Sequence, residues 1–216
     1  MGEFLIDIKN LSVEYKTDEA TVYAVNDVEL SVKKGETLGL VGETGAGKTT
    51  IAKSILGILP KPQATITSGS IEFEDRELLE LKEKEMQKIR GDKIAMIFQD
   101  PMTALNPVET VGYQIYEAII QHNKIKKSEA RQRACDMLEM VGIPGERYGE
   151  YPHQFSGGMK QRVVIAMALA CNPELLLADE PTTALDVTIQ AQVLDMMRGL
   201  KEKLNTSVVL ITHDFG

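Results

Sequence analysis

The sequence predicts an α/β fold whose core is a parallel β-sheet covered on both faces. Three short segments are almost continuously apolar, as strands buried on both faces are; they are residues 94–98, 175–178 and 208–212. A fourth apolar segment, 37–41, runs directly into a glycine-rich loop, and helical spacing follows over 49–59. In open sheets of this kind, ligands bind beyond the carboxyl ends of the strands. We therefore expect the functional site at that edge of the sheet.

The N-terminal part of the chain predicts an antiparallel β region at the edge of the molecule. Residues 5–15 and 23–32 carry apolar side chains in short runs or in alternation, which is typical of strands, and the polar residues 17–20 between them predict a turn. Residues 75–92 instead combine a few leucines with dense charge. This combination predicts a helix on the protein surface.

Helical spacing elsewhere indicates an inserted helical lobe. Between residues 108 and 149, apolar residues recur on helical faces, and Ser128 is the expected N-cap of one of these helices. The helix over 49–59 is expected to stop at Pro60 and Pro62, because proline cannot continue the hydrogen-bond pattern of a helix.

The length of the chain suits one domain, residues 1–216. In this domain, residues 1–100 and 155–216 are expected to form the core with its β subdomain, and about 101–154 the helical subdomain. A hydrophobic content of 43% and a charged content of 26% are ordinary for a globular protein. The net charge of −8 repels nucleic acid, so we expect no nucleic-acid partner.

The cysteines and the apolar runs bear on the compartment. Cys135 and Cys171 lie in helical patterns without a CxxC partner, which predicts two reduced thiols in a cytoplasmic protein. The longest apolar run, 163–171, is shorter than the ~20 residues that cross a bilayer. The N-terminus lacks the basic and apolar regions of a signal peptide. If this chain works at a membrane, it must therefore use the spans of another chain.

The glycine-rich loop has the pattern G-x-x-x-x-G-K-T, which is specific for phosphate binding. Its glycines let successive backbone N–H groups face phosphate oxygens, and the following helix N-terminus assists them. Lys48 is expected to reach the β- and γ-phosphates of a nucleotide, and Thr49 to offer its hydroxyl to Mg²⁺. The expected nucleotide-binding residues in this loop are Gly42, Glu43, Thr44, Gly45, Ala46, Gly47, Lys48, Thr49 and Thr50.

Two adjacent carboxylates, Asp179 and Glu180, follow the buried strand 175–178. Asp179 is the expected Mg²⁺ ligand, directly or through water, and Glu180 is the expected residue that polarises water against the γ-phosphorus. The alternative is that both carboxylates bind metal. The Asn-Lys-x-Asp segment of guanine-specific sites does not occur in the sequence, so ATP is the expected nucleotide.

A second glycine-rich turn, Ser156-Gly157-Gly158, opens another predicted helix. One nucleotide does not need two such cradles, so the sequence predicts two chains that close face to face over shared nucleotides. With the phosphate loop, this turn, Asp-Glu-Pro and a strand ending in His213 in this order, the chain resembles the ABC ATPase family over nearly all of its length. The resemblance implies a P-loop NTPase (RecA-like) core with an N-terminal antiparallel β subdomain and an inserted α-helical subdomain.

The same resemblance implies roles for individual residues. Ser156 and Gly158 would contact the γ-phosphate held by the opposite subunit, with Gly157 between them. Gln99 would join Mg²⁺ and the attacking water to the helical lobe, and His213 would sense the γ-phosphate.

Two further positions follow from the resemblance. Residues 183–186 look like the family's D-loop, in which Asp186 would lie at the nucleotide of the partner chain. Adenine normally stacks on an aromatic ring in this family; Tyr15 is the better match, with Tyr23 as the alternative.

Three segments look like the dipeptide/oligopeptide importer ATPases: residues 99–107, 151–159 and 181–190. Related nickel-importing ATPases share much of the sequence of these segments. Thr44 and Ala46 stand where serines are usual, and neither removes a backbone donor. The resemblance implies Mg-ATP hydrolysis at the cytoplasmic face of the inner membrane. The implied partners are a second ATPase subunit (the same chain or a sister), two transmembrane permease subunits and, indirectly, an extracytoplasmic solute-binding protein.

Two other functions compete with transport. An ABC ATPase acting on DNA or ribosomes would be expected to carry coiled-coil or zinc insertions or basic tracts, and a regulatory module without turnover would be expected to lack Glu180 or His213. The sequence ends at Gly216, shortly after His213, whereas family members of this type continue, often with a cysteine-rich segment that binds an iron–sulfur cluster. No such cluster is expected here, and the last strand would lack a covering helix.

Overall fold

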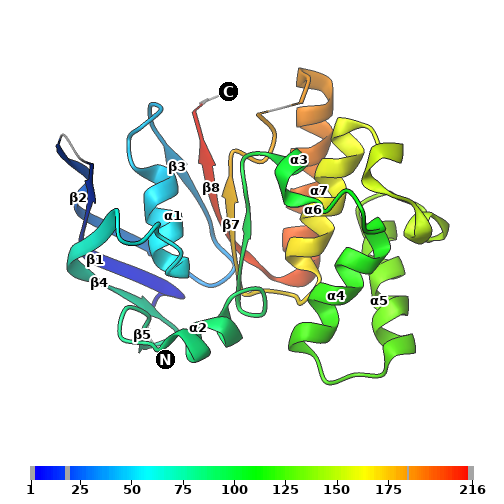
Figure 1. The fold of residues 1–216 in the computed structure, drawn as a ribbon, viewed down its shortest axis with the longest axis horizontal. Helices are drawn as coiled ribbons and strands as arrows, with labels where there is room; N and C mark the ends of the chain where they lie inside the picture. Colours follow the sequence, from blue (N-terminus) through cyan, green and yellow to red (C-terminus); the bar gives the residue numbers. More distant parts are fainter. Residues whose placement is uncertain (1–2, 18–19, 184, 214–216) are drawn as a thin grey trace. The chain divides into compact units, whose positions relative to one another are not determined.

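The computed structural model describes residues 3–17, 20–183 and 185–213. The chain separates into two compact units: a first unit of Met1–Arg90 with Ser207–Gly216, and a second unit of Gly91–Thr206. Figure 1 shows the antiparallel strands of the first unit side by side and the helices α4 and α5 of the second unit packed as a pair. The division into core and helical subdomain expected from the sequence stays a prediction.

An antiparallel sheet forms much of the first unit. Its strands are β1 (Ile6–Lys16), β2 (Thr21–Val32), β4 (Ala64–Phe73) and β5 (Arg76–Glu77), in the order β2-β1-β4-β5. The predicted N-terminal antiparallel region is thus confirmed, although residues 18 and 19 of the predicted turn lie outside the described residues. Sequence reasoning missed β4, because its middle is a run of threonine and serine and only Ala64, Ile71 and Phe73 are buried.

The predicted surface helix over residues 75–92 is largely wrong. Its start is the strand β5, and the helix α2 covers only Glu83–Ile89. The side chain of Glu77 accounts for the difference, because its carboxylate accepts hydrogen bonds from the backbone N–H groups of Ile71 and Leu79. These bonds hold an extended turn where charge density alone predicts a helix.

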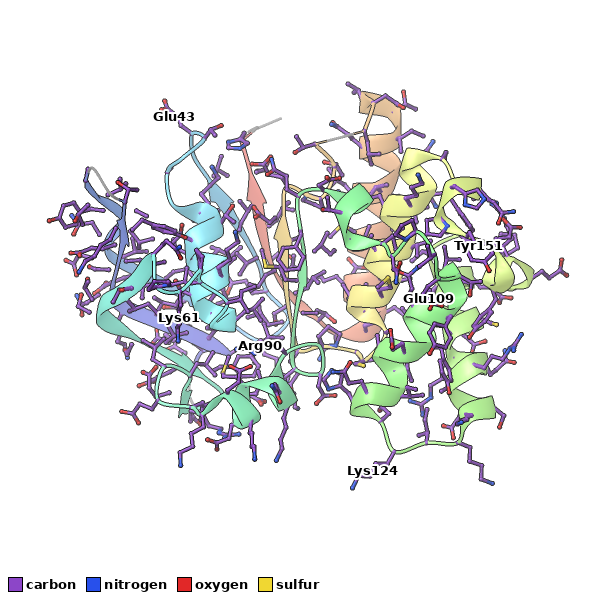
Figure 2. The ribbon with its side chains drawn as sticks, in the orientation of Figure 1. Glu43, Lys61, Arg90, Glu109, Lys124 and Tyr151 are labelled. Atoms are coloured by element: carbon purple, nitrogen blue, oxygen red, sulfur yellow. The ribbon has the colours of Figure 1, made fainter. Side chains whose placement is uncertain are left out.

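The first unit also holds a parallel strand pair and the helix between its strands. β3 (Thr37–Val41) pairs in parallel with β8 (Ser207–Thr212), and α1 (Lys48–Leu56) follows the glycine-rich loop. The helix ends earlier than predicted and not at the prolines: Gly57 takes a left-handed conformation with φ 62° and caps the last turn. Arg90, which Figure 2 labels, supports this end, since its Nε donates to the Leu56 carbonyl oxygen at 2.7 Å.

The second unit combines a parallel strand pair with helices. β6 (Ile94–Ile97) pairs with β7 (Leu175–Asp179), so both predicted buried strands are confirmed. The helical elements are α3 (Pro101–Ala104), α4 (Val111–His122), α5 (Lys127–Met140), the 3₁₀ turns η1 (Gly145–Gly149) and η2 (Pro152–Gln154), α6 (Gly157–Leu169) and α7 (Val187–Leu204). Helix over 108–149 is confirmed, but Ser128 as an N-cap is wrong: α5 already begins at Lys127, which places Ser128 inside the first turn.

No helix within the described ranges is long and apolar enough to cross a membrane. Cys135 and Cys171 are free thiols, as predicted. Burial raises the pKa of the Cys171 thiol to about 11, and this thiol donates to the carbonyl oxygen of Ala118 at 3.4 Å. Cys171 therefore packs as a small side chain rather than acting as a reactive thiolate.

Two buried glutamines of the second unit differ in how their amides are paired. Gln114 is 6% exposed: its Oε1 accepts from the Asn106 N–H, and its Nε2 donates to the carbonyl oxygens of Asn106 and Glu109. Gln161, on α6, is 1% exposed, and neither its Nε2 nor its Oε1 has a hydrogen-bond partner among the described residues. A buried amide without partners keeps its full desolvation penalty.

We predict that the two glutamines respond in opposite directions to replacement by methionine. Gln161→Met should raise the free energy of unfolding by about 1–2 kcal/mol, because it removes an unpaired buried amide and keeps the side-chain volume. Gln114→Met, the matched control, should lower it by about 1–3 kcal/mol because the groups it bonds lose their partner. Urea denaturation of both variants measures the difference. Equal destabilisation by both would show that Gln161 is paired in solution.

Candidate functional site

The glycine-rich loop connects β3 to α1 in the first unit and depends on backbone conformations that favour glycine. Gly45 and Gly47 have φ of 83° and 85°, in the left-handed region. Gly47 is also the N-cap of α1, and a Cβ at this position would lie 2.1 Å from the carbonyl oxygen of Ala24 on β2. The loop can therefore lie against β2 only with glycine at position 47. Figure 2 shows the side chain of Glu43 at the outer tip of this loop, where Glu43 is exposed.

Lys48 begins α1 and is held inside the loop. Its side chain is buried, and its Nζ donates to the carbonyl oxygens of Gly42 at 2.7 Å and Glu43 at 2.8 Å. Thr49 and Thr50 follow in the first turn of the helix. A buried ammonium group thus lies beside the N-terminus of a helix, and both favour an anion.

His213 lies next to this loop, directly after β8. Its Nδ1 is 3.0 Å from the carbonyl oxygen of Gly42 and 3.3 Å from Nζ of Lys48. The carbonyl oxygen can only accept and the ammonium group can only donate, so one ring nitrogen cannot bond both at once. A proton on Nδ1 selects Gly42, and its absence selects Lys48. Within the first unit, the structure therefore joins the loop, Lys48 and His213, as the sequence predicted for strand ends at one edge.

In the second unit, the residues that follow β6 and β7 meet at Glu180. Asp179 and Glu180 are 3% and 6% exposed at the end of β7. Oε2 of Glu180 accepts a hydrogen bond from Nε2 of Gln99 at 2.7 Å and another from Oγ1 of Thr183 at 3.0 Å. Gln99 thus contacts the Glu180 carboxylate directly, while its expected role toward Mg²⁺ and the attacking water stays a prediction. Sequence reasoning missed Thr183 as a donor to Glu180. Thr183 lies three residues after Glu180 with Pro181 between them, and this spacing could have predicted a turn that brings the two side chains together.

The backbone at Glu180 is in an uncommon conformation. Its φ is 48°, in the left-handed region, which non-glycine residues adopt at a cost of about 1–3 kcal/mol. The turn that follows stabilises it, because the Thr183 N–H donates to the Glu180 carbonyl oxygen at 3.3 Å. The carboxylate is therefore aimed by backbone and side-chain bonds together.

The second glycine-rich turn begins α6. Ser156 is the N-cap, and its Oγ accepts from the Met159 N–H at 3.4 Å. A Cβ on Gly158 would lie 2.7 Å from Cγ2 of Ile189 on α7, so a larger residue here would displace the Ile189 side chain. Gly157 lies beside them, where a Cβ would meet Leu185 at 3.9 Å.

The predicted D-loop, residues 183–186, leads into α7 beside this turn; its Ala184 lies outside the described residues. Asp186 is the N-cap of α7 and accepts from the Ile189 N–H at 3.0 Å. Ser156 and Asp186 are both exposed. Two helix N-termini with exposed caps thus lie next to each other in the second unit, and their proposed contact with a nucleotide stays a prediction.

The two tyrosines proposed for adenine lie on neighbouring strands of the first unit. Tyr15, on β1, is half-buried and pairs in register with Val22 and Ala64. Tyr23, on β2, is 70% exposed and precedes Ala24, against which the glycine-rich loop packs. Both remain alternatives for stacking on the base.

The first unit has a strand, a glycine-rich loop and a helix with a buried lysine. The second unit has a parallel strand that ends in buried carboxylates. These features define the P-loop nucleoside triphosphatase fold. A family model described as ABC transporter matches residues 25–183, and the chain belongs to this family. The predicted fold class is thereby confirmed.

Relatives and a solved structure agree with this assignment. The chain is 53% identical over 214 residues to the oligopeptide transport ATP-binding protein OppD and 54% identical over 216 residues to the dipeptide transport ATP-binding protein DppD, both of Bacillus subtilis (strain 168). These matches cover 98% and 99% of the chain but 60% and 64% of the relatives, so the chain spans less than two thirds of their length. The dimeric ATP-binding cassette MJ0796, bound to ADP and Pi, superposes with a TM-score of 0.85 at 33% identity, covering 97% of this chain and 88% of that one.

We predict that Gly47→Ala weakens ATP binding by at least about tenfold, whereas Gly45→Ala weakens it only a few-fold. Both glycines have similar positive φ, so both variants carry similar backbone strain. Only the Gly47 variant brings a Cβ against the Ala24 carbonyl oxygen, since nothing lies within 4 Å of a Cβ at Gly45. Isothermal titration calorimetry with ATP measures the ratio, and equal affinities would contradict the steric role of Gly47.

Proposed function

We propose that this chain is the ATP-binding subunit of an ABC importer, in which Mg-ATP hydrolysis drives the uptake of dipeptides or oligopeptides through separate membrane subunits. The observation that carries the enzymatic part is the buried Glu180 carboxylate, oriented by Gln99 and Thr183. A module that only binds a nucleotide does not require a carboxylate aimed in this way. A carboxylate held by fixed donors can instead orient a water molecule for attack.

The phosphate site fits a nucleoside triphosphate. Glycine at position 47 lets the loop lie against β2, and Lys48 offers a buried ammonium group at the helix N-terminus. In the proposed site, the loop N–H groups and Lys48 bind the phosphates, while Thr49, Gln99 and Asp179 bind Mg²⁺. The bound Mg-ATP supplies the phosphoanhydride bond. Glu180 orients the water, and His213, whose Nδ1 lies 3.3 Å from Nζ of Lys48, would sense the γ-phosphate.

A second ATPase subunit completes the proposed site. The exposed caps Ser156 and Asp186, with Gly157 and Gly158, present helix N-termini that suit phosphate oxygens. The dimeric form of the cassette MJ0796, which contains ADP and Pi, supports a two-chain arrangement. The second subunit is either another copy of this chain or a sister ATPase.

The transport role is inferred from the relatives, which are named as peptide transport ATP-binding proteins. Two transmembrane permease subunits would supply the membrane spans, and an extracytoplasmic solute-binding protein would act indirectly through them. The chain would then lie at the cytoplasmic face of the inner membrane. Nickel or another small solute is the alternative cargo, and the net charge of −8 disfavours a nucleic-acid partner.

We predict that Glu180→Gln forms a dimer in the presence of Mg-ATP and remains monomeric without it. The amide keeps the shape of the side chain but cannot polarise water, so ATP persists between the two chains. Size-exclusion chromatography with light scattering measures the mass, and Glu180→Gln combined with Lys48→Met is the control that should stay monomeric. ATP binding without dimerisation would contradict the two-chain site, and no ATP binding would contradict the proposed function itself.

We predict that Thr183→Val lowers kcat for ATP hydrolysis by about three- to tenfold with little change in KM. Valine keeps the shape of threonine but removes the hydroxyl that donates to Oε2 of Glu180. Thr183→Ser retains this donor and should keep near-normal turnover. Steady-state phosphate release measures both variants, and equal rates for valine and serine would show that the hydroxyl does not orient Glu180.

A further inference from the structure

Arg147 contacts both sides of the Ser156-Gly157-Gly158 turn from a different element. It lies in η1, upstream of the turn. Its guanidinium carbon is 4.2 Å from the ring centroid of Phe155, the residue directly before Ser156. Its Nη1 donates to Sδ of Met159, the residue directly after Gly158, at 3.6 Å. One side chain therefore spans the turn.

A further contact ties Arg147 to the segment that enters the turn. Its Nη2 donates to the Gln154 carbonyl oxygen at 3.3 Å. The Phe155 ring beneath the guanidinium is 5% exposed, so it offers a fixed surface for stacking. Gln154 and Phe155 before the N-cap and Met159 after it thus all contact one planar group.

Glu150 holds the guanidinium in this orientation. Its Oε2 accepts from Nε of Arg147 at 2.9 Å and from Nη2 at 2.5 Å. The hydrogen bonds raise the pKa of Arg147 and lower the pKa of Glu150, so both groups are charged across the ordinary pH range. With Nε and Nη2 bonded to one carboxylate oxygen, the plane of the guanidinium is fixed, and its face covers Phe155.

We propose that Arg147 is a positioning residue for the Ser-Gly-Gly turn, which it clamps between Phe155 and Met159 so that the start of α6 is ordered before the turn meets the nucleotide of a partner chain. The second half of this inference rests on the proposed function. The glycines of the turn contribute no side-chain contacts of their own, and Ser156 is exposed. Within the turn, order comes from the Ser156 cap and from the close packing of Gly158 against Ile189. Arg147 adds contacts on both flanks of the turn.

Lysine is the informative replacement, because it keeps the charge and loses the planar fork and the stacking. Arg131→Lys is a matched control: the Arg131 guanidinium carbon lies 4.6 Å from the ring centroid of Tyr148, also in η1, and no described contact joins it to the turn. Phe155→Leu is a second variant that keeps an apolar side chain and removes the ring. If Arg147 and Phe155 act as one clamp, the effects of the two substitutions will not add in the double variant.

Amide hydrogen exchange without nucleotide tests the clamp directly. The N–H groups of Met159 and Lys160 are bonded to Oγ and O of Ser156, so their exchange reports the order of the turn. We expect about tenfold faster exchange at these amides in Arg147→Lys and in Phe155→Leu, with Ile165 in the middle of α6 unchanged. Arg131→Lys should match the parent protein. Unchanged exchange in both Arg147→Lys and Phe155→Leu would overturn the inference.

Dimerisation tests the functional consequence. In the Glu180→Gln background with Mg-ATP, Arg147→Lys should weaken dimerisation by about tenfold while ATP affinity of the monomer stays within about twofold, because the loop that holds Lys48 is unchanged. The Arg131→Lys control should dimerise like the background. Faster exchange with undiminished dimerisation would overturn the role in the two-chain site. If the background itself does not dimerise, the proposed function fails, and the exchange measurement alone still decides whether Arg147 orders the turn.

Discussion

The close approach of Gly47 to the carbonyl oxygen of Ala24 is the contact on which the positions of the loop, Lys48 and His213 depend. It lets the loop turn into α1 against β2, and the helix then places Lys48 inside the loop, where the ammonium group bonds two loop carbonyl oxygens. His213 completes this arrangement through Gly42 and Lys48. A larger residue at position 47 would separate the loop from β2 and displace Lys48 with it. The glycine is therefore a steric requirement and not only a conformational one.

At Glu180, side-chain hydrogen bonds fix the position of a functional group, as the backbone contact at Gly47 does in the first unit. A buried carboxylate is unfavourable unless donors compensate it, and two donors from different segments share its Oε2. The left-handed backbone at Glu180 adds strain that the turn to Thr183 offsets. Strain and burial of this kind persist where surrounding contacts determine one geometry, and the outcome here is a carboxylate with a fixed direction.

The strands with strong apolar signals were predictable within about two residues, because burial on both faces leaves an unambiguous pattern. β4 was not predictable, since threonine, serine and glycine interrupt its apolar residues and its strand pairing depends on β1. The positions of candidate residues in sequence motifs, such as Lys48 in the loop and Glu180 at a strand end, were also predictable from chemistry and spacing. Thr183 and Arg147 were not, because their roles come from contacts that exist only after folding. Spacing could suggest a turn at Thr183, but no pattern in the sequence indicates that Arg147 stacks on Phe155.

The division of roles among these residues also bears on cargo. In the proposed site, Lys48, His213 and the loop glycines would bind or sense phosphate. Gln99, Thr183 and Glu180 would hold and orient the attacking water. Arg147 and the two exposed N-caps address the order and approach of the Ser-Gly-Gly turn. None of these groups has a chemistry that distinguishes a peptide from a metal ion or another solute. In the proposed importer, the choice of solute therefore belongs to the partner chains, and this chain contributes the energy of ATP hydrolysis, which is independent of what is carried.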